Sequence, residues 1–349
     1  MLKKSIYFLI IFSASLSAQA NSLQVKKDYQ QCLLQAIESA ADTVTILELK
    51  AGCQSISNKY ENELVQSEQS IQPELKDGSQ QGKGQLVEQR LKEESLFAHS
   101  GRGLTGHKPN YIIYSYNTKD PETQVFEQQF PGENIDFDQG EIKFQISTKF
   151  LIAEDLFGDN GNLYAAYTNR SFWQASNDNI SSPFRDYNHE PEIWLSFKND
   201  YELWGFKNSI ISAGFVHQSN GRAGSLSRSW NRVYANFVVE KDNFVFSFKP
   251  WYRIKEDDDD DDNPDIEKYL GHFEFQSVYK HNDHSFALMF RNNLRTGENR
   301  GASQLDWTFP LHKNFKGYLQ WFNGYGESLI DYNHNVNAIG LGIKFTDWL

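Results

Sequence analysis

The feature that most constrains this chain is an alternation of apolar and polar residues that recurs from about residue 110 to the end. In the stretch 141–150, Ile142, Phe144 and Ile146 take one face of a strand while Lys143 takes the other. Side chains of a β-strand point alternately to its two faces, so each such strand has one apolar and one polar face. We predict twelve strands, at 110–116, 141–151, 162–174, 190–199, 209–219, 229–240, 243–253, 268–280, 284–294, 302–309, 316–325 and 336–346.

The long alternating strands favour a barrel in a membrane. After residue 20 the chain has no stretch near the roughly 20 apolar residues of a spanning helix, and 15% of its residues are aromatic. Lipid cannot satisfy an open sheet edge, so apolar-outward strands must close on themselves. The predicted fold is all-β, a twelve-stranded antiparallel transmembrane β-barrel preceded by a small helical or disordered N-terminal extension. A soluble β-sandwich or barrel is the alternative from composition alone.

The predicted connections have the asymmetry of such a barrel. An even strand number returns both termini to one side, which we expect to be periplasmic. The connections on the other side, such as 175–189, 220–228 and 254–267, are long and polar. Those on the periplasmic side, such as 281–283, are tight turns. Long outer loops with short periplasmic turns are the expected pattern.

The N-terminal region indicates export. Lys3 and Lys4 precede a short apolar run that ends at Ala18-Gln19-Ala20, a small-x-small cleavage pattern. We therefore predict a signal peptide at 1–20, a periplasmic extension at 21–105 and the barrel domain at 106–349. Within the extension, residues 85–97 are predicted to form a short exposed helix.

Charge and cysteine content bear on two further kinds of chemistry. The formal net charge of −12 argues against nucleic acid as a partner. It would suit divalent cations, although general solubility explains it equally well. The two cysteines, Cys32 and Cys53, both lie near the N-terminus, where an exported chain is expected to join them in a disulfide. A cysteine nucleophile is therefore not expected.

Three polar residues share the apolar face of one predicted hairpin. His217 and Ser219 follow the same parity as Phe215, and Asn231 on the return strand follows that of Val233. A hydroxyl becomes a nucleophile when a positioned base accepts its proton, and an amide can hold the imidazole as a carboxylate does in other triads. We predict Ser219 as nucleophile, His217 as base and Asn231 as the orienting amide.

A histidine two residues before a serine is weak evidence by itself, since most such pairs in strands are incidental. Its place on a face that contacts lipid strengthens it, because polar groups there are costly and usually functional. If the face touches lipid, the substrate is expected to be a lipid.

The competing hypotheses are a non-catalytic pore or scaffold and an outer-membrane protease. A pore needs an open lumen, whereas charge pairs are expected to fill this one, from Lys143, Lys149, Arg170, Glu192, Glu274 and Arg291.

Several longer motifs surround these residues. They are HQSNGR at 217–222, SRSWNR at 227–232, KPWY at 249–252, DDNPDIEKY at 261–269, SSPFR at 181–185 and GYGESLIDYN at 324–333. With these motifs and their spacing, the part 105–349 resembles the outer-membrane phospholipase A family of Gram-negative bacteria. The resemblance implies calcium-dependent hydrolysis of phospholipid acyl esters in the outer leaflet of the outer membrane. It also implies activation by homodimerisation.

The resemblance assigns further residues by position. It implies that the Gly221 backbone N–H forms part of an oxyanion hole. The implied Ca²⁺ ligands are Ser181, Arg222 through its carbonyl, Ser227 and Asp262, and oxygen ligands of this kind suit calcium. The chain departs from the family at Gly224, where relatives carry an aspartate near a second calcium site. Asn169 is a candidate for the dimer seam, although a polar strand end near the membrane interface would explain it equally well.

Overall fold

A computed structural model describes Cys32 and residues 86–347, apart from gaps at 100–103, 134, 179–183, 258 and 260. The chain divides into two compact units, Met1–Gln81 and Gly82–Leu349, and every described residue except Cys32 belongs to the second. The predicted signal peptide and the disulfide partner Cys53 lie outside the described residues, so both stay predictions. Within the described part, no helix is long and apolar enough to cross a membrane.

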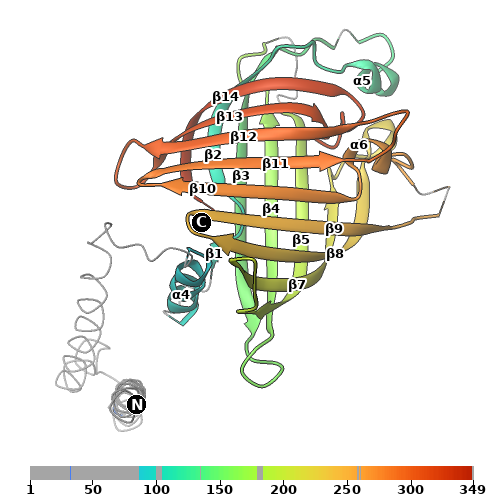
Figure 1. The fold of residues 1–349 in the computed structure, drawn as a ribbon. Coiled ribbons are helices and arrows are strands. Elements are labelled where there is room, and N and C mark those ends of the chain that lie inside the picture. Colours follow the sequence, from blue (N-terminus) through green and yellow to red (C-terminus); the bar gives the residue numbers. More distant parts are fainter. Residues whose placement is uncertain are drawn as a thin grey trace, which may run out of the picture. The chain divides into compact units, whose positions relative to one another are not determined.

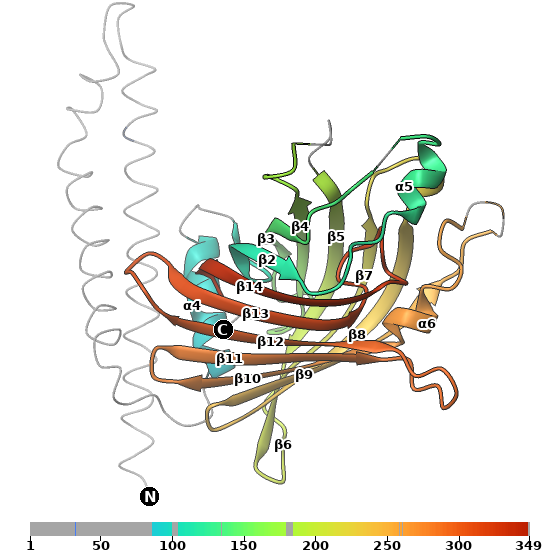
Figure 2. The ribbon, with the colours of Figure 1, turned by 90° about the horizontal axis from the view of Figure 1, so that it is seen from above.

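The second unit is a closed antiparallel β-barrel of twelve long strands (Figure 1). Because β14 pairs with β2 and β2 with β3, the sheet closes on itself as predicted. Its strands are β2 (Asn110–Asn117), β3 (Gly140–Ala153), β4 (Asn162–Trp173), β5 (Phe184–Lys198), β7 (Phe206–Ser219), β8 (Ser229–Lys241), β9 (Phe244–Ile254), β10 (Phe273–His281), β11 (His284–Asn292), β12 (Gly301–Pro310), β13 (Lys316–Tyr325) and β14 (Asn335–Thr346). The remaining elements are the short strands β1 (Thr105–Gly106) and β6 (Glu202–Leu203), helices α4 (Leu86–His99), α5 (Gln124–Gln129) and α6 (Glu267–Leu270), and the 3-10 turn η1 (Gly224–Leu226). Helices α5 and α6 lie at the same end of the barrel (Figure 2).

Two strands, β5 and β10, begin well away from their predicted positions. Strand β5 starts at Phe184, well before residue 190, because its first residues pair with Phe172 and Trp173 of β4. Strand β10 starts at Phe273 because the preceding residues form α6. That helix ends at Gly271, whose φ of 72° is in the left-handed region that glycine tolerates.

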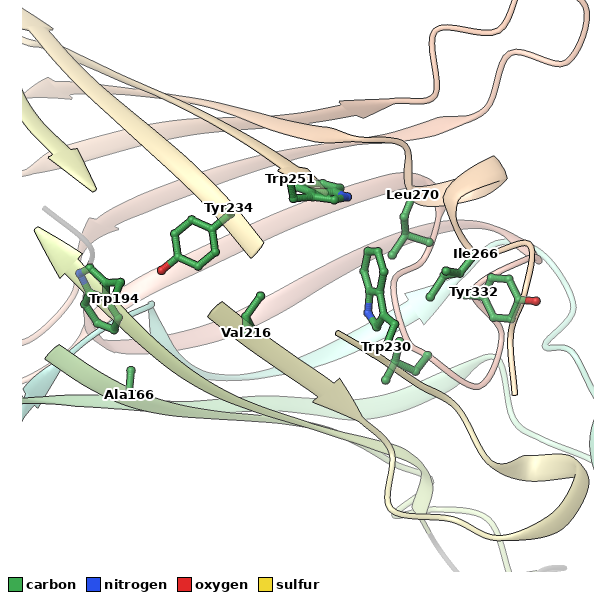
Figure 3. Packing of buried hydrophobic residues seen from close by; sticks show 10 residues of the cluster. Ala166, Trp194, Val216, Trp230, Tyr234, Trp251, Ile266, Leu270 and Tyr332 are labelled. Carbon is green, nitrogen blue, oxygen red and sulfur yellow. The ribbon is translucent and has the colours of Figure 1, made fainter. Parts of the chain in front are cut away.

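The two faces of the sheet differ as the alternation predicts. On the β7–β8 hairpin, Phe215 and Val233 are exposed, whereas Val216 and Trp230 are almost fully buried. Figure 3 shows such inward side chains gathered into one cluster, which extends from Ala166 and Trp194 to Ile266 and Tyr332. An exposed apolar wall around a filled interior is the arrangement expected of a barrel in lipid.

Ion pairs fill the barrel interior, as predicted. Lys143 is 1% exposed, and its Nζ lies 2.7 Å from both Glu327 Oε1 and Gln320 Oε1. Farther along the interior, Lys249 Nζ lies 3.5 Å from Glu192 Oε2. Buried charges need such partners because taking them out of water is costly. The interior is therefore a packed polar core.

Helix α4 differs from the prediction of an exposed helix at residues 85–97. Leu86 and Val87 are buried against Val238 and Val245 on the inner faces of β8 and β9. The Val87 N–H donates to Glu240 Oε2 at 3.1 Å, which satisfies one of the free donors of the first turn. The prediction was wrong because the apolar residues stand together at the helix start, where they give little helical periodicity. The helix belongs to the predicted extension in sequence, yet it packs with the barrel.

Candidate active site

The β7–β8 hairpin places the three predicted catalytic residues on one exposed wall. In its register His217 lies opposite Asn231, and Ser219 lies opposite Ser229. All three predicted residues are half-buried, and their strand neighbours on the same face, Phe215 and Val233, are exposed apolar side chains. The site therefore opens toward the membrane side of the wall.

His217 and Asn231 are in direct contact. His217 Nδ1 lies 2.9 Å from Asn231 Oδ1, and Asn231 Nδ2 donates to Glu256 Oε1, also at 2.9 Å. Among the hydrogen bonds of the described residues, none joins Ser219 Oγ to the imidazole. The two side chains share a face two positions apart, and catalytic hydrogen bonds often tighten only when substrate binds. The structure thus brings together the predicted base and the predicted orienting amide, with Ser219 on the same strand face.

A buried asparagine shapes the loop that follows Ser219. Asn220 donates through Nδ2 to the Leu226 carbonyl at 2.9 Å, and its Oδ1 accepts from the Arg228 N–H at 3.0 Å. These bonds let the loop turn back within a few residues. Gly221, at its start, has a φ of 62°, where a residue with a Cβ would be strained. The loop conformation therefore depends on the Asn-Gly pair of the motif.

Side chains on the inner face of the β7–β8 hairpin stabilise it. Trp230 is fully buried and donates through Nε1 to Gln218 Oε1 at 2.8 Å, and the Arg232 guanidinium lies 3.9 Å from the Trp230 ring centre. Figure 3 shows Trp230 and Val216 directed into the interior. These inward residues, which alternate with the outward site residues along the two strands, thus help to hold β7 and β8 in register.

The other sequence motifs converge on the same end of the barrel. The Arg222 guanidinium donates to the Phe184 and Arg185 carbonyls at 2.8 and 2.9 Å. Arg185 pairs in turn with Asp331, at 2.7 Å, from the loop between β13 and β14. Residues 184–185 of the first motif are therefore held by contacts from the motifs 217–222 and 324–333.

A tyrosine of the same loop ties in the segment before α6. Burial, together with the hydrogen bond that its hydroxyl donates to Asp265 at 2.5 Å, raises the pKa of Tyr332. The hydroxyl therefore remains a donor at neutral pH. The Asn263 side chain accepts from the Ser229 N–H at 2.9 Å, so the motif 261–269 also anchors the start of β8.

Two of the four predicted calcium ligands meet in the described structure. Ser227 Oγ donates to Asp262 Oδ2 at 2.5 Å. Arg222 lies in the same loop as Ser227, whereas Ser181 lies outside the described residues. No cluster of three or more histidine, cysteine, aspartate or glutamate side chains suited to a metal occurs in the described part of the chain. The two predicted ligands that meet are instead a hydroxyl and a carboxylate, which supply hard oxygen atoms of the type calcium prefers.

The structure adds a second histidine that the sequence analysis missed. His189 pairs in register with Ser219, and its Cδ2 lies 3.7 Å from the position that a Cβ on Gly221 would take. Its Nδ1 contacts Tyr167 Oη at 2.5 Å and Asn169 Nδ2 at 3.3 Å. The prediction began this strand at residue 190, so the outward parity of His189 was not considered.

Glu256 was also missed. It stands beyond the end of β9, within an acidic run that gives no sign of which carboxylate reaches back. No sequence signal distinguishes it, because its contact with Asn231 follows from the path of the chain after Ile254.

A closed barrel whose apolar outer wall carries a histidine, a serine and an amide side chain defines a class of membrane barrel with a site at the lipid boundary. Comparison with known proteins supports this assignment to a class of membrane barrel. A profile of the family described as phospholipase A1 matches residues 87–345. The phospholipases A1 of Escherichia coli K12 and Klebsiella pneumoniae are 39% and 38% identical over 244 residues, 70% of this chain and 82% of each relative.

Solved structures give the same result. The outer membrane phospholipase A of Escherichia coli matches with a TM-score of 0.65 and 36% identity, over 70% of this chain and 99% of that one. The Salmonella typhi outer membrane phospholipase, a dimer with bound calcium, matches with a TM-score of 0.66 and 36% identity, over 72% and 95% of the two chains. The chain belongs to the phospholipase A1 family. It is a phospholipase of the outer membrane.

Proposed function

We propose that this phospholipase hydrolyses glycerophospholipid and lysophospholipid acyl esters, with phospholipase A1 and A2 activity, through a Ser219–His217–Asn231 triad that requires calcium. The observation that carries the proposal is the 2.9 Å contact between His217 Nδ1 and Asn231 Oδ1 on the exposed wall. Polar side chains that face lipid are energetically costly, and for this reason those that are present usually have a function.

The proposed reaction uses the residues in named roles. His217 Nε2 accepts the proton of Ser219 Oγ as the oxygen attacks the acyl carbonyl carbon. The Gly221 N–H donates to the carbonyl oxygen as it becomes negative. The imidazolium then protonates the departing alcohol, which leaves as lysophospholipid from a diacyl substrate, and water hydrolyses the acyl-serine ester to release the fatty acid. Asn231 keeps the imidazole in the orientation that both proton transfers need.

We propose that Ser227 Oγ, a carboxylate oxygen of Asp262, the Arg222 carbonyl and Ser181 hold the calcium ion. The 2.5 Å contact between Ser227 and Asp262 supports this, since it brings a hard oxygen ligand of the loop that follows Ser219 against one of the connection between β9 and α6. When bound, calcium would supply positive charge that stabilises the oxyanion.

We further propose that the site faces the outer leaflet and is switched on by homodimerisation. The Salmonella typhi relative, which is a dimer with bound calcium, supports this. Two barrels that meet at this wall would enclose the acyl chains and complete the metal site. Asn169, on the same wall two strands from β7, is the candidate for the seam.

The proposal is tested with Ser219→Ala, assayed for calcium-dependent release of fatty acid from phosphatidylcholine in detergent micelles. Ser303→Ala serves as the matched control, because Ser303 lies on β12 in register with Phe290 and Asn323, away from the site. We expect no release above background from the first variant and wild-type release from the second. Retained activity in Ser219→Ala would refute the nucleophile.

A non-catalytic pore is the alternative function. The buried interior argues against it, because Lys143, Phe172, Tyr318 and Phe322 are each no more than 2% exposed. Helix α4 also packs against the inner faces of β8 and β9. Single-channel recording in a planar bilayer should therefore detect no conductance.

A further inference from the structure

Glu256 is the one charged side chain that hydrogen-bonds to a member of the triad among the described residues. Its Oε1 accepts from Asn231 Nδ2 at 2.9 Å, while Asn231 Oδ1 lies 2.9 Å from His217 Nδ1. Asn231 thus bridges a carboxylate and an imidazole. Glu256 is half-buried and follows β9 by two residues, directly beyond the Ile254 that pairs with Asn231.

The carboxylate decides which way the amide faces. An ionised carboxylate only accepts hydrogen bonds, so the amide atom that faces Glu256 must be the NH₂ group. The amide oxygen must then face His217. In the opposite orientation two acceptors, the amide oxygen and the carboxylate, would meet, and the NH₂ group would face the imidazole.

The orientation of the amide in turn fixes the imidazole tautomer. An acceptor opposite Nδ1 requires the proton to reside on Nδ1, which leaves Nε2 as the unprotonated nitrogen. Only that tautomer can take the proton of Ser219. With the NH₂ group opposite Nδ1, the proton would move to Nε2 and the base would be blocked.

We propose that Glu256 is a positioning residue of the catalytic site, which orients Asn231 and through it selects the active tautomer of His217. This inference rests on the triad proposed above. It adds to that triad a fourth member from a different element, the connection between β9 and α6. Glu256 itself need not touch the substrate.

The test compares Glu256→Ala, Glu256→Gln, Asn231→Ala and the double variant Asn231→Ala/Glu256→Ala. Each is the full chain in detergent micelles with saturating calcium, and the phosphatidylcholine concentration is varied so that kcat and KM are measured separately. Asp257→Ala is the matched control, because it removes a neighbouring exposed carboxylate. Heat-dependent migration on a gel confirms that each barrel is folded.

We expect Glu256→Ala to lower kcat about tenfold, which is about 1.4 kcal/mol in the barrier, with KM unchanged. Glu256→Gln keeps an acceptor for the amide, but its own NH₂ group can also face Asn231, so its kcat should fall between those of wild type and Glu256→Ala. In the Asn231→Ala background the loss of Glu256 should have no further effect, because the residue acts only through the amide. Asp257→Ala should match wild type.

Wild-type kcat in Glu256→Ala would overturn the inference. So would a loss in Glu256→Gln as large as in Glu256→Ala, or a tenfold loss that recurs in the Asn231→Ala background. Ser219→Ala, measured in parallel, distinguishes failure of the Glu256 inference from failure of the proposed triad. If it is inactive while Glu256→Ala is fully active, the triad stands and only the role of Glu256 fails.

Discussion

Replacement of Arg185 by methionine should strongly destabilise the barrel while leaving its surface unchanged. The guanidinium donates to both carboxylate oxygens of Glu141, from Nη2 at 2.7 Å and from Nε at 3.0 Å. Its Nη1 lies 2.7 Å from Asp331 Oδ2. Methionine fills a similar volume but leaves two carboxylates without their cation.

The expected magnitude follows from burial. The Arg185 side chain is 6% exposed, and those of Glu141 and Asp331 are 11% and 5% exposed. Removing one partner of a buried pair costs about 3–5 kcal/mol, because the remaining charge is left uncompensated. With two carboxylates stranded, we expect a loss of about 5 kcal/mol in the free energy of unfolding. Arg185→Lys keeps the charge but not the paired geometry and should cost about 2 kcal/mol.

The assay is urea unfolding in detergent micelles, followed by tryptophan fluorescence. A lower midpoint with an unchanged slope reports a loss of stability without a change in the surface exposed on unfolding. Arg295→Met is the control, since Arg295 is an exposed side chain of the β11–β12 loop, and its replacement should change stability by less than about 0.5 kcal/mol.

An unfolding free energy of Arg185→Met within about 1 kcal/mol of wild type would refute the reasoning. It would mean that the Glu141 and Asp331 carboxylates reach water or other partners at little cost. An equal loss in Arg185→Met and Arg185→Lys would show that charge is not the source of the stabilisation.

Three further predictions concern the site. Asn231→Ala should lower kcat roughly 10- to 100-fold with little change in KM, and an unchanged kcat would exclude the orienting role. A calcium chelator should abolish fatty-acid release, and calcium but not magnesium should restore it, whereas activity that survives chelation would remove the metal from the reaction. Gly221→Ala should lower the free energy of unfolding by about 1 kcal/mol, because φ is 62° there, and should lower kcat by shifting the N–H; an unaltered variant would show that the loop relaxes freely.

The barrel itself could be predicted because its physical cause is local. Period-two alternation decides which side chains of a strand share a face, and lipid requires the sheet to close. The parity of His217, Ser219 and Asn231 followed from the same rule, and the structure pairs His217 with Asn231 directly. These predictions needed no knowledge of any distant contact.

The errors came where distant contacts override local pattern. Helix α4 is partly buried because of two residues far along the chain. Glu240 accepts a hydrogen bond from its first turn, and Val238 packs against that turn. Strand β5 extends back to Phe184 because β4 offers partners there, and this extension places His189 beside Ser219. Neither follows from the composition of the segment concerned.

By itself, the sequence determined the closed sheet, the face that meets lipid and the candidate nucleophile, base and amide, because strand periodicity and adjacent motif residues carry that information. Only the tertiary structure decided that Glu256 reaches Asn231 and that Arg185 joins Glu141 to Asp331. The physical reason is that a hydrogen bond or ion pair depends on positions within about 3 Å. Such positions arise only when the strands are in register and the loops have folded back over them.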